Sequence, residues 1–82
     1  MRGTGLVGVG GAGVYAYFTA AGGAVRLRVS VDEFDQLGLN EGQRVAVALP
    51  GGGPRDLLVV AAARTPPVVW LELRPAAARS AG

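Results

Sequence analysis

Residues 24–32 read "AVRLRVSVD", and this stretch decides how the rest of the chain is interpreted. Apolar side chains alternate with arginine, serine and aspartate, and they fall at Val25, Leu27, Val29 and Val31. A period of two places the apolar residues on one face of a strand and the polar residues on the other. Such a strand is typical of an antiparallel sheet that covers a core on one side only.

The residues that follow predict a short helix and then a tight turn. Ser30 and Glu33 have the spacing of a capping box, and Gly38 is a typical helix stop. One or two helical turns near residues 31–37 fit between them and place Phe34 and Leu37 on one side. Asn40-Glu41-Gly42 then predicts a tight turn before the apolar alternation resumes.

Five more stretches have the composition of strands, and glycine or proline separates them. The apolar sets Val45, Val47, Leu49 and Val69, Leu71, Leu73 each fall on one face of their strand. Turns are expected at Gly10-Gly11, Gly22-Gly23, residues 51–54 and residues 65–67. The expected strands cover residues 3–10, 13–20, 43–49, 56–64 and 68–74. Short strands with turn signals every 8–12 residues predict a small barrel or sandwich.

Size and composition limit the chain to one small folded domain. It has 82 residues, of which 50% are hydrophobic and 17% charged, so it is too apolar for intrinsic disorder. It has no cysteine or histidine, which excludes disulfides, the usual soft metal sites and Ser–His or Cys–His nucleophiles. All eight basic residues are arginine; either a GC-rich genome or selection for anion binding explains this.

Residues 3–25 carry no charge and follow Arg2, which raises the question of an export signal or a membrane span. Eight glycines dilute this run, and Thr4 and Thr19 interrupt it, so it lacks a compact leucine-rich core. We therefore expect a cytoplasmic protein that does not interact with membranes.

Gly8, Gly10 and Gly13 have the spacing of a dinucleotide-binding loop, and Asp32 follows 19 residues after Gly13. Such a loop needs a buried parallel strand before it and a long helix after it. Gly22-Gly23 would break that helix, and the strand at residues 25–31 has a polar face. The pattern favours a glycine-rich hairpin, and we expect no cofactor.

The segment "VSVDEFDQLGLNEGQRVAVAL", residues 29–49, resembles the C-terminal half of a TOBE or molybdenum-pterin-binding (Mop-like) repeat. The match is carried by Leu37, Gly38, Leu39, Gly42 and Val45. The resemblance implies a small β-barrel that binds an oxyanion or another small ligand, often across a subunit interface. Together with the strand pattern it predicts an all-β fold: a five- to six-stranded antiparallel barrel of the OB, SH3 or TOBE type. We expect residues 1–74 to form this domain and residues 75–82 a flexible tail.

The acidic residues do not predict catalysis. Asp32, Glu33 and Asp35 cluster at the expected helix start, where backbone dipoles favour carboxylates. A site for a hard metal ion is the alternative. We expect no enzyme, no catalytic residues and no bound metal.

Aromatic and basic residues in adjacent strands predict a more specific function. Tyr15 and Tyr17 share one face of their strand, and a turn at Gly22-Gly23 would bring Arg26 and Arg28 onto the same sheet. Single-stranded nucleic acid uses this combination, because bases stack on rings and arginine holds phosphates. The alternative is that the tyrosines pack inward or cover an oligomer interface.

Trp70 has a separate interpretation. It shares a strand face with Val68 and Glu72, so it is a candidate anchor of an interface or a plug at one end of the barrel.

Taken together, these patterns lead us to expect a non-catalytic binding or assembly module, with single-stranded nucleic acid as the leading ligand. The alternatives are small-ligand or oxyanion binding and a domain that pairs with a second copy or another protein.

Overall fold

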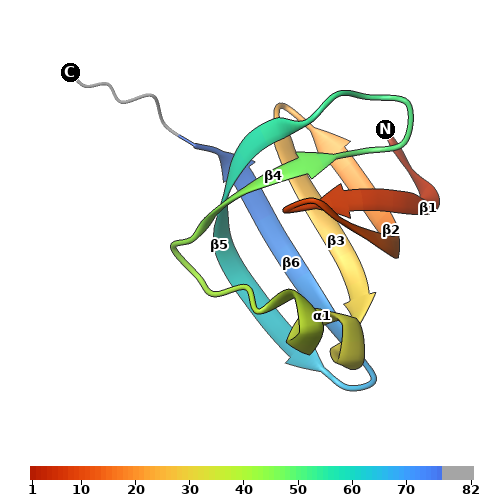
Figure 1. Ribbon diagram of the computed structural model, residues 1–82, viewed down its shortest axis with the longest axis vertical. Helices are drawn as coiled ribbons and strands as arrows, with labels where there is room; N and C mark the ends of the chain where they lie inside the picture. The colour runs from red at the N-terminus through yellow and green to blue at the C-terminus, as the bar shows by residue number, and fades with distance from the viewer. Residues whose placement is uncertain (77–82) are drawn as a thin grey trace.

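A computed structural model describes residues 1–76 and shows a closed six-stranded antiparallel β-barrel (Figure 1). Around the barrel the strands follow the order β1-β2-β3-β6-β5-β4, and β4 pairs with β1 to close it. This confirms the predicted all-β barrel with one short helix. The elements are β1 (Arg2–Val9), β2 (Ala12–Ala21), β3 (Ala24–Ser30), α1 (Val31–Leu37), β4 (Arg44–Ala48), β5 (Arg55–Thr65) and β6 (Val68–Pro75).

Two glycine pairs make the tight turns of the first three strands. Gly10 and Gly11 connect β1 to β2 with φ of 59° and 89°, and Gly22 and Gly23 connect β2 to β3 with φ of 59° and 84°. Two successive residues with positive φ match the right-handed twist of a hairpin, and glycine adopts this conformation without steric cost. The expected hairpin at Gly10-Gly11 is therefore confirmed, and its glycines precede a strand rather than the helix of a dinucleotide-binding loop.

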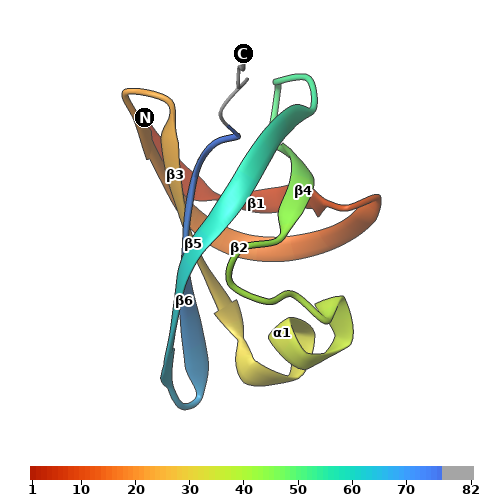
Figure 2. The same ribbon diagram turned by 90° about the vertical axis from the view of Figure 1, so that its left-hand side faces the viewer.

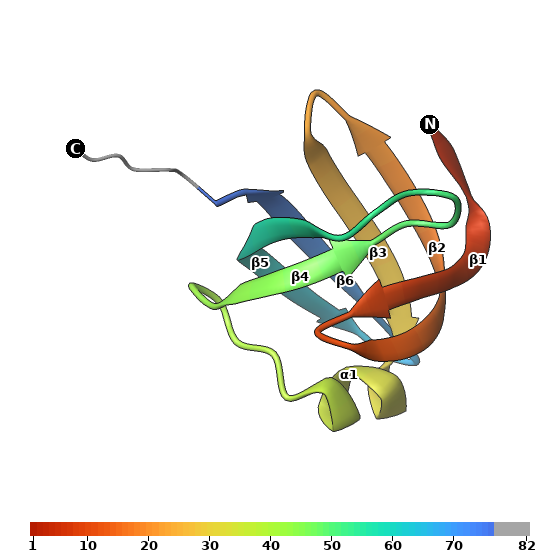
Figure 3. The same cartoon turned by 45° about the horizontal axis from the view of Figure 1, so that its top comes forward.

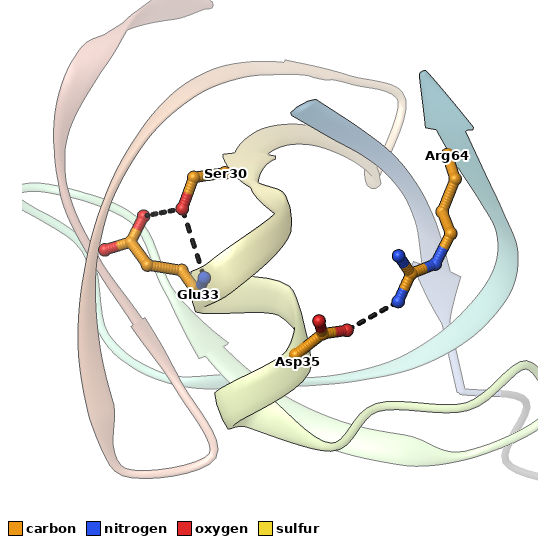
Figure 4. A network of polar contacts seen from close by, with 4 residues as sticks. All are labelled: Ser30, Glu33, Asp35 and Arg64. Carbon is orange, nitrogen blue, oxygen red and sulfur yellow. Dashed lines mark hydrogen bonds and ion pairs between the residues drawn. The ribbon is translucent and has the colours of Figure 1, made fainter. Parts of the chain in front are cut away.

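The helix α1 lies across one end of the barrel, beside the end of β3 (Figure 3). The hydroxyl of Ser30 accepts a hydrogen bond from the backbone N–H of Glu33 at 3.1 Å, and Gly38 ends the helix with φ of 65° (Figure 4). Both caps agree with prediction. Val31 differs, because the predicted strand included it, whereas the cap at Ser30 starts the helix there. Phe34 of α1 packs against the core.

The core follows from the alternation in every strand. Val25, Leu27 and Val29 are at most 2% exposed, while Arg26 and Arg28 between them point outward. Among the described residues no polar or charged residue is buried. The remaining core residues are Val7, Val9, Val14, Ala16, Phe18, Leu39, Val45, Val47, Leu57, Val59, Val69, Leu71 and Leu73.

The continuous apolar run of residues 56–64 becomes a strand with an irregular register. β5 buries Leu57 and Val59, but a register shift against β6 lies between Val59 and Ala61. A bulge of this kind sets one extra residue outside the alternation. Val60 follows buried Val59 and is 36% exposed, and after the shift Ala62 is the next residue of β5 that packs against the core.

The domain extends slightly beyond its predicted boundary at residue 74. Pro75 belongs to β6, and the backbone N–H of Ala76 donates a 3.2 Å hydrogen bond to the carbonyl oxygen of Asp56. Pro75 and Ala76, which the prediction assigned to the tail, are thus both connected to β5. Residues 77–82 of that tail lie outside the described part of the chain.

The uncharged run of residues 3–25 forms β1, β2 and the beginning of β3. Within residues 1–76, no helix has both the length and the hydropathy needed to cross a bilayer.

Leu71 tests the contribution of the core to stability. Its side chain is fully buried, so Leu71→Ala removes apolar contacts and leaves a cavity. We expect the free energy of unfolding to fall by about 2–5 kcal/mol. Val60→Ala on the outer side of β5 is the control and should change it by no more than about 0.5 kcal/mol. Urea denaturation measures both; equal losses would contradict the assigned core.

Candidate nucleic-acid interface

The predicted binding residues lie on the outer face of β2, β3 and β6. Tyr17 of β2 is the register partner of Arg28 in β3, and Arg28 is in turn the partner of Trp70 in β6. These three residues therefore form one transverse row across three neighbouring strands. Arg26, two residues before Arg28, points outward beside the row.

The side chains in this row contact one another. The guanidinium carbon of Arg28 lies 5.2 Å from the ring centre of Tyr17 and 5.8 Å from that of Trp70. The guanidinium carbon of Arg26 lies 4.9 Å from the Trp70 ring centre. The two rings meet edge to face, with centres 6.2 Å apart and an interplanar angle of 82°. Cation–π attraction therefore holds both arginines on the aromatic rings.

Tyr15 and Tyr17 point away from the core. Tyr15 is 65% exposed, and Tyr17 is half-buried under its neighbours. The inward-facing positions of the same strand belong to Val14, Ala16 and Phe18, which are all buried. The alternative in which the tyrosines pack inward is therefore wrong. The alternative in which they cover an interface between copies stays a prediction.

The arginines divide into two groups by their polar partners. Arg44 pairs with Asp56, Arg64 with Asp35, and Arg74 with Glu72 at 3.0 Å. Arg55 donates a 3.3 Å hydrogen bond to the carbonyl oxygen of Gly23. Among residues 1–76, the arginines that make no ion pair or hydrogen bond through their side chains are Arg2, Arg26 and Arg28.

These three unpaired arginines lie close together on one surface. Arg2 in β1 and Arg26 in β3 are both register partners of Thr19 in β2, so one strand separates them. Arg28 follows two residues after Arg26 on the same face. Arg26 is also the register partner of Glu72 in β6, but Glu72 pairs with Arg74, so the outer face of β1, β2 and β3 keeps a local excess of positive charge.

Two acidic residues of α1, Glu33 and Asp35, have different partners. Glu33 faces Ser30, with 3.3 Å between its carboxylate and the Ser30 hydroxyl, whereas Asp35 pairs with Arg64 of β5 (Figure 4). Arg64 also covers the ring of Phe34, with its guanidinium carbon 5.4 Å from the ring centre. Among the described residues, no three acidic side chains gather as ligands of a metal ion. These contacts give Asp35 a structural role, because they attach α1 to β5.

The segment that resembles a Mop-like repeat forms the end of β3, α1 and β4. Gly38 ends the helix, and Gln43 donates its backbone N–H to the carbonyl oxygen of Asn40 in the predicted turn. A hollow of about 460 Å³ beside β4 has an apolar lining of glycine, alanine, leucine and proline. Oxyanion binding by this segment stays a prediction.

Two members of the site depend on strand pairing that the sequence does not reveal. The pairing of β3 with β6 places Trp70 on the outer face beside Arg28, and its expected role at an interface stays a prediction. Arg2 joins the surface because β1 pairs with β2 over its whole length. The sequence signal for Trp70 was its outward position in an alternating strand, whereas Arg2 lies one residue before the first expected strand.

Comparisons with models of protein families, with curated proteins and with solved structures give no match. The aromatic and charged surface itself is therefore the only guide to what this chain binds.

A double-mutant cycle tests whether Arg26 interacts with Trp70. We expect Arg26→Gln and Trp70→Leu to show a coupling of about 0.5–1 kcal/mol in the free energy of unfolding, because each removes one partner of the cation–π contact. The control cycle combines Trp70→Leu with Arg44→Gln on β4, and its coupling should be near zero. Urea denaturation of the single and double variants gives both values; equal couplings would argue against the contact.

Proposed function

We propose that the outer face of β1, β2, β3 and β6 binds single-stranded nucleic acid. One observation carries this proposal: the three arginines without polar partners lie on the same surface as Tyr15, Tyr17 and Trp70. We refer to these six residues as the Tyr–Arg–Trp face. It combines ligands for phosphate with platforms for bases, which is the combination that single strands require.

The arginines supply the electrostatic part of binding. Arg2, Arg26 and Arg28 make no ion pair among the described residues, and Glu72, the register partner of Arg26, pairs with Arg74. A guanidinium presents several N–H donors in a planar fork that fits phosphate oxygens. Because the net charge of the chain is only +2, attraction depends on this local concentration rather than on the whole molecule.

The aromatic rings supply the stacking part. Tyr15 has the most accessible ring of the face, with 65% of the residue exposed. The rings of Tyr17 and Trp70 already carry arginines, so a base that stacks there shares the ring surface with a guanidinium. A duplex keeps its bases stacked internally, whereas a single strand offers them to such rings. Stacking accepts every base, so we expect little sequence preference.

We also propose that the chain is a non-catalytic binding module and that it acts in the cytoplasm. Its ligand is a polyanion on an open sheet surface, and no cofactor takes part in binding.

Binding is tested by fluorescence anisotropy of a labelled mixed-sequence single strand, titrated with protein at several salt concentrations. Three arginine–phosphate contacts predict a slope of log affinity against log salt near −2, from roughly −0.7 per contact. Arg28→Gln should weaken binding and make the slope shallower by one contact. Tyr15→Ala should weaken binding while leaving the salt slope unchanged, because it removes stacking alone.

Arg44→Gln is the matched control, because it removes the same charge from an arginine that is paired with Asp56 on β4. It should leave affinity nearly unchanged. Trp70 is the only tryptophan of the chain, so its fluorescence reports directly on the proposed face. Absence of saturable binding at low salt would overturn the proposal, and so would equal effects of Arg28→Gln and Arg44→Gln.

A further inference from the structure

β1 is paired along one edge and mostly unpaired along the other. It pairs with β2 over eight positions, from Arg2 to Val9. On its other side it pairs with β4 only at Gly8 and Val9. Within the described part of the chain, no strand pairs with residues 2–7 on that side. The barrel is therefore closed at one end of β1 and has an open strand edge at the other.

The hydrogen-bonding pattern shows which backbone groups this edge presents. Met1 and Ala20 exchange both backbone hydrogen bonds. In an antiparallel pair this pattern repeats every second residue, so the backbone N–H and C=O groups of the odd-numbered residues of β1 point toward β2. Gly10 donates its N–H to the carbonyl oxygen of Ala46 across the β4 side. By the same alternation, the N–H and C=O groups of Arg2, Thr4 and Leu6 point away from β2. They form a row of donors and acceptors along the open edge.

Exposed apolar side chains gather beside the same edge. Leu6 is 65% exposed, and its register partner Tyr15 is exposed to the same extent. Met1, next to the start of β1, is 70% exposed. Val60 is the remaining large hydrophobic residue that is exposed among residues 1–76, and it lies on β5. Apolar surface concentrated at an unpaired strand edge is typical of a site where another strand adds.

The loop between β4 and β5 borders this edge but forms no strand pair with it. The loop between β4 and β5 diverges from the start of β1 in Figure 2, and a hollow of about 460 Å³ lies between Met1 and residues 49–55. Pro50 approaches β1 from the inner side, where a Cβ added to Gly5 would lie 3.1 Å from its ring. Pro50 itself is exposed, so the loop borders β1 here without forming part of the core.

We propose that this edge pairs with the same edge of a second copy, as antiparallel strands related by a two-fold axis at Thr4. Thr4 then faces Thr4 of the other copy, and Arg2 faces Leu6. The three residues of each edge exchange six backbone hydrogen bonds. This register keeps the arginines apart, because directly opposed like charges destabilise a strand pair. Residues 2–7 contain no proline, lysine or acidic residue, which commonly protect exposed edges.

Pairing in this way makes one continuous sheet from two copies of β1, β2 and β3. The outer surfaces that carry Arg2, Tyr15 and Tyr17 then adjoin across the two-fold axis. The proposal goes beyond nucleic-acid binding and does not depend on it, because it rests on the backbone edge and on exposed apolar side chains. In this geometry Thr4 is the residue of the edge that faces its own counterpart across the two-fold axis.

Charge substitutions at Thr4 test this geometry by size-exclusion chromatography with light scattering. The wild-type protein should become dimeric as its concentration rises. Thr4→Lys and Thr4→Glu should each be monomeric, because two equal charges would face each other at the axis. A mixture of these two variants should restore a dimer that contains one copy of each. Thr65→Lys, at an exposed threonine on β5, is the control and should leave the wild-type dimer intact.

Circular dichroism shows that each variant is folded, which the exposure of Thr4 allows. The mixture provides a further check, because only folded variants can re-form the pair. Anisotropy with a labelled single strand separates this proposal from the function proposed above. Thr4 is the register partner of Tyr17, so Thr4→Lys adds a positive charge beside the Tyr–Arg–Trp face and should not weaken nucleic-acid binding, although it abolishes the dimer. A wild-type protein that stays monomeric at every concentration overturns the proposal. Failure of the mixture to pair would overturn the register at Thr4.

Discussion

The pairing of β3 with β2 on one side and with β6 on the other is the constraint on which the rest of the structure depends. It joins the two three-stranded halves of the barrel through six register pairs. The same pairing buries Leu27 and turns Arg28 outward between Tyr17 and Trp70. Packing of the core and composition of the candidate site thus follow from one register. A shift by one residue would place arginine in the core and leucine on the surface.

Local features of the fold could be predicted because their causes are local. Two consecutive glycines at residues 10 and 11 accept the positive φ of a hairpin, whatever the strands pair with later. Ser30 caps the helix that begins one residue after it, and Gly38 ends that helix. The boundaries of helices and strands are harder to predict where two local signals compete. Val31 fits both the alternation of the strand and the start of the helix, and the cap decides in favour of the helix.

The candidate site was only partly predictable, because it combines neighbours along the chain with partners far from them. Tyr17 and Arg28 belong to one hairpin, so their proximity follows from the turn at residues 22 and 23. Trp70 lies more than forty positions after Arg28, and no local pattern indicates which strand will be its neighbour. The direction of the tyrosines also depends on the whole barrel, because Val14, Ala16 and Phe18 compete for the interior of the same strand.

The two seams between the halves of the barrel differ greatly in extent, and this affects how the molecule moves. Six register pairs connect β3 to β6, whereas two connect β1 to β4. Local opening is easiest where the fewest hydrogen bonds and buried contacts must be given up. The barrel therefore opens along the shorter seam while the longer one acts as its hinge. Brief access of water to the interior between β1 and β4 follows from this inequality, and the backbone amides of Gly8 and Gly10 are the first to lose protection.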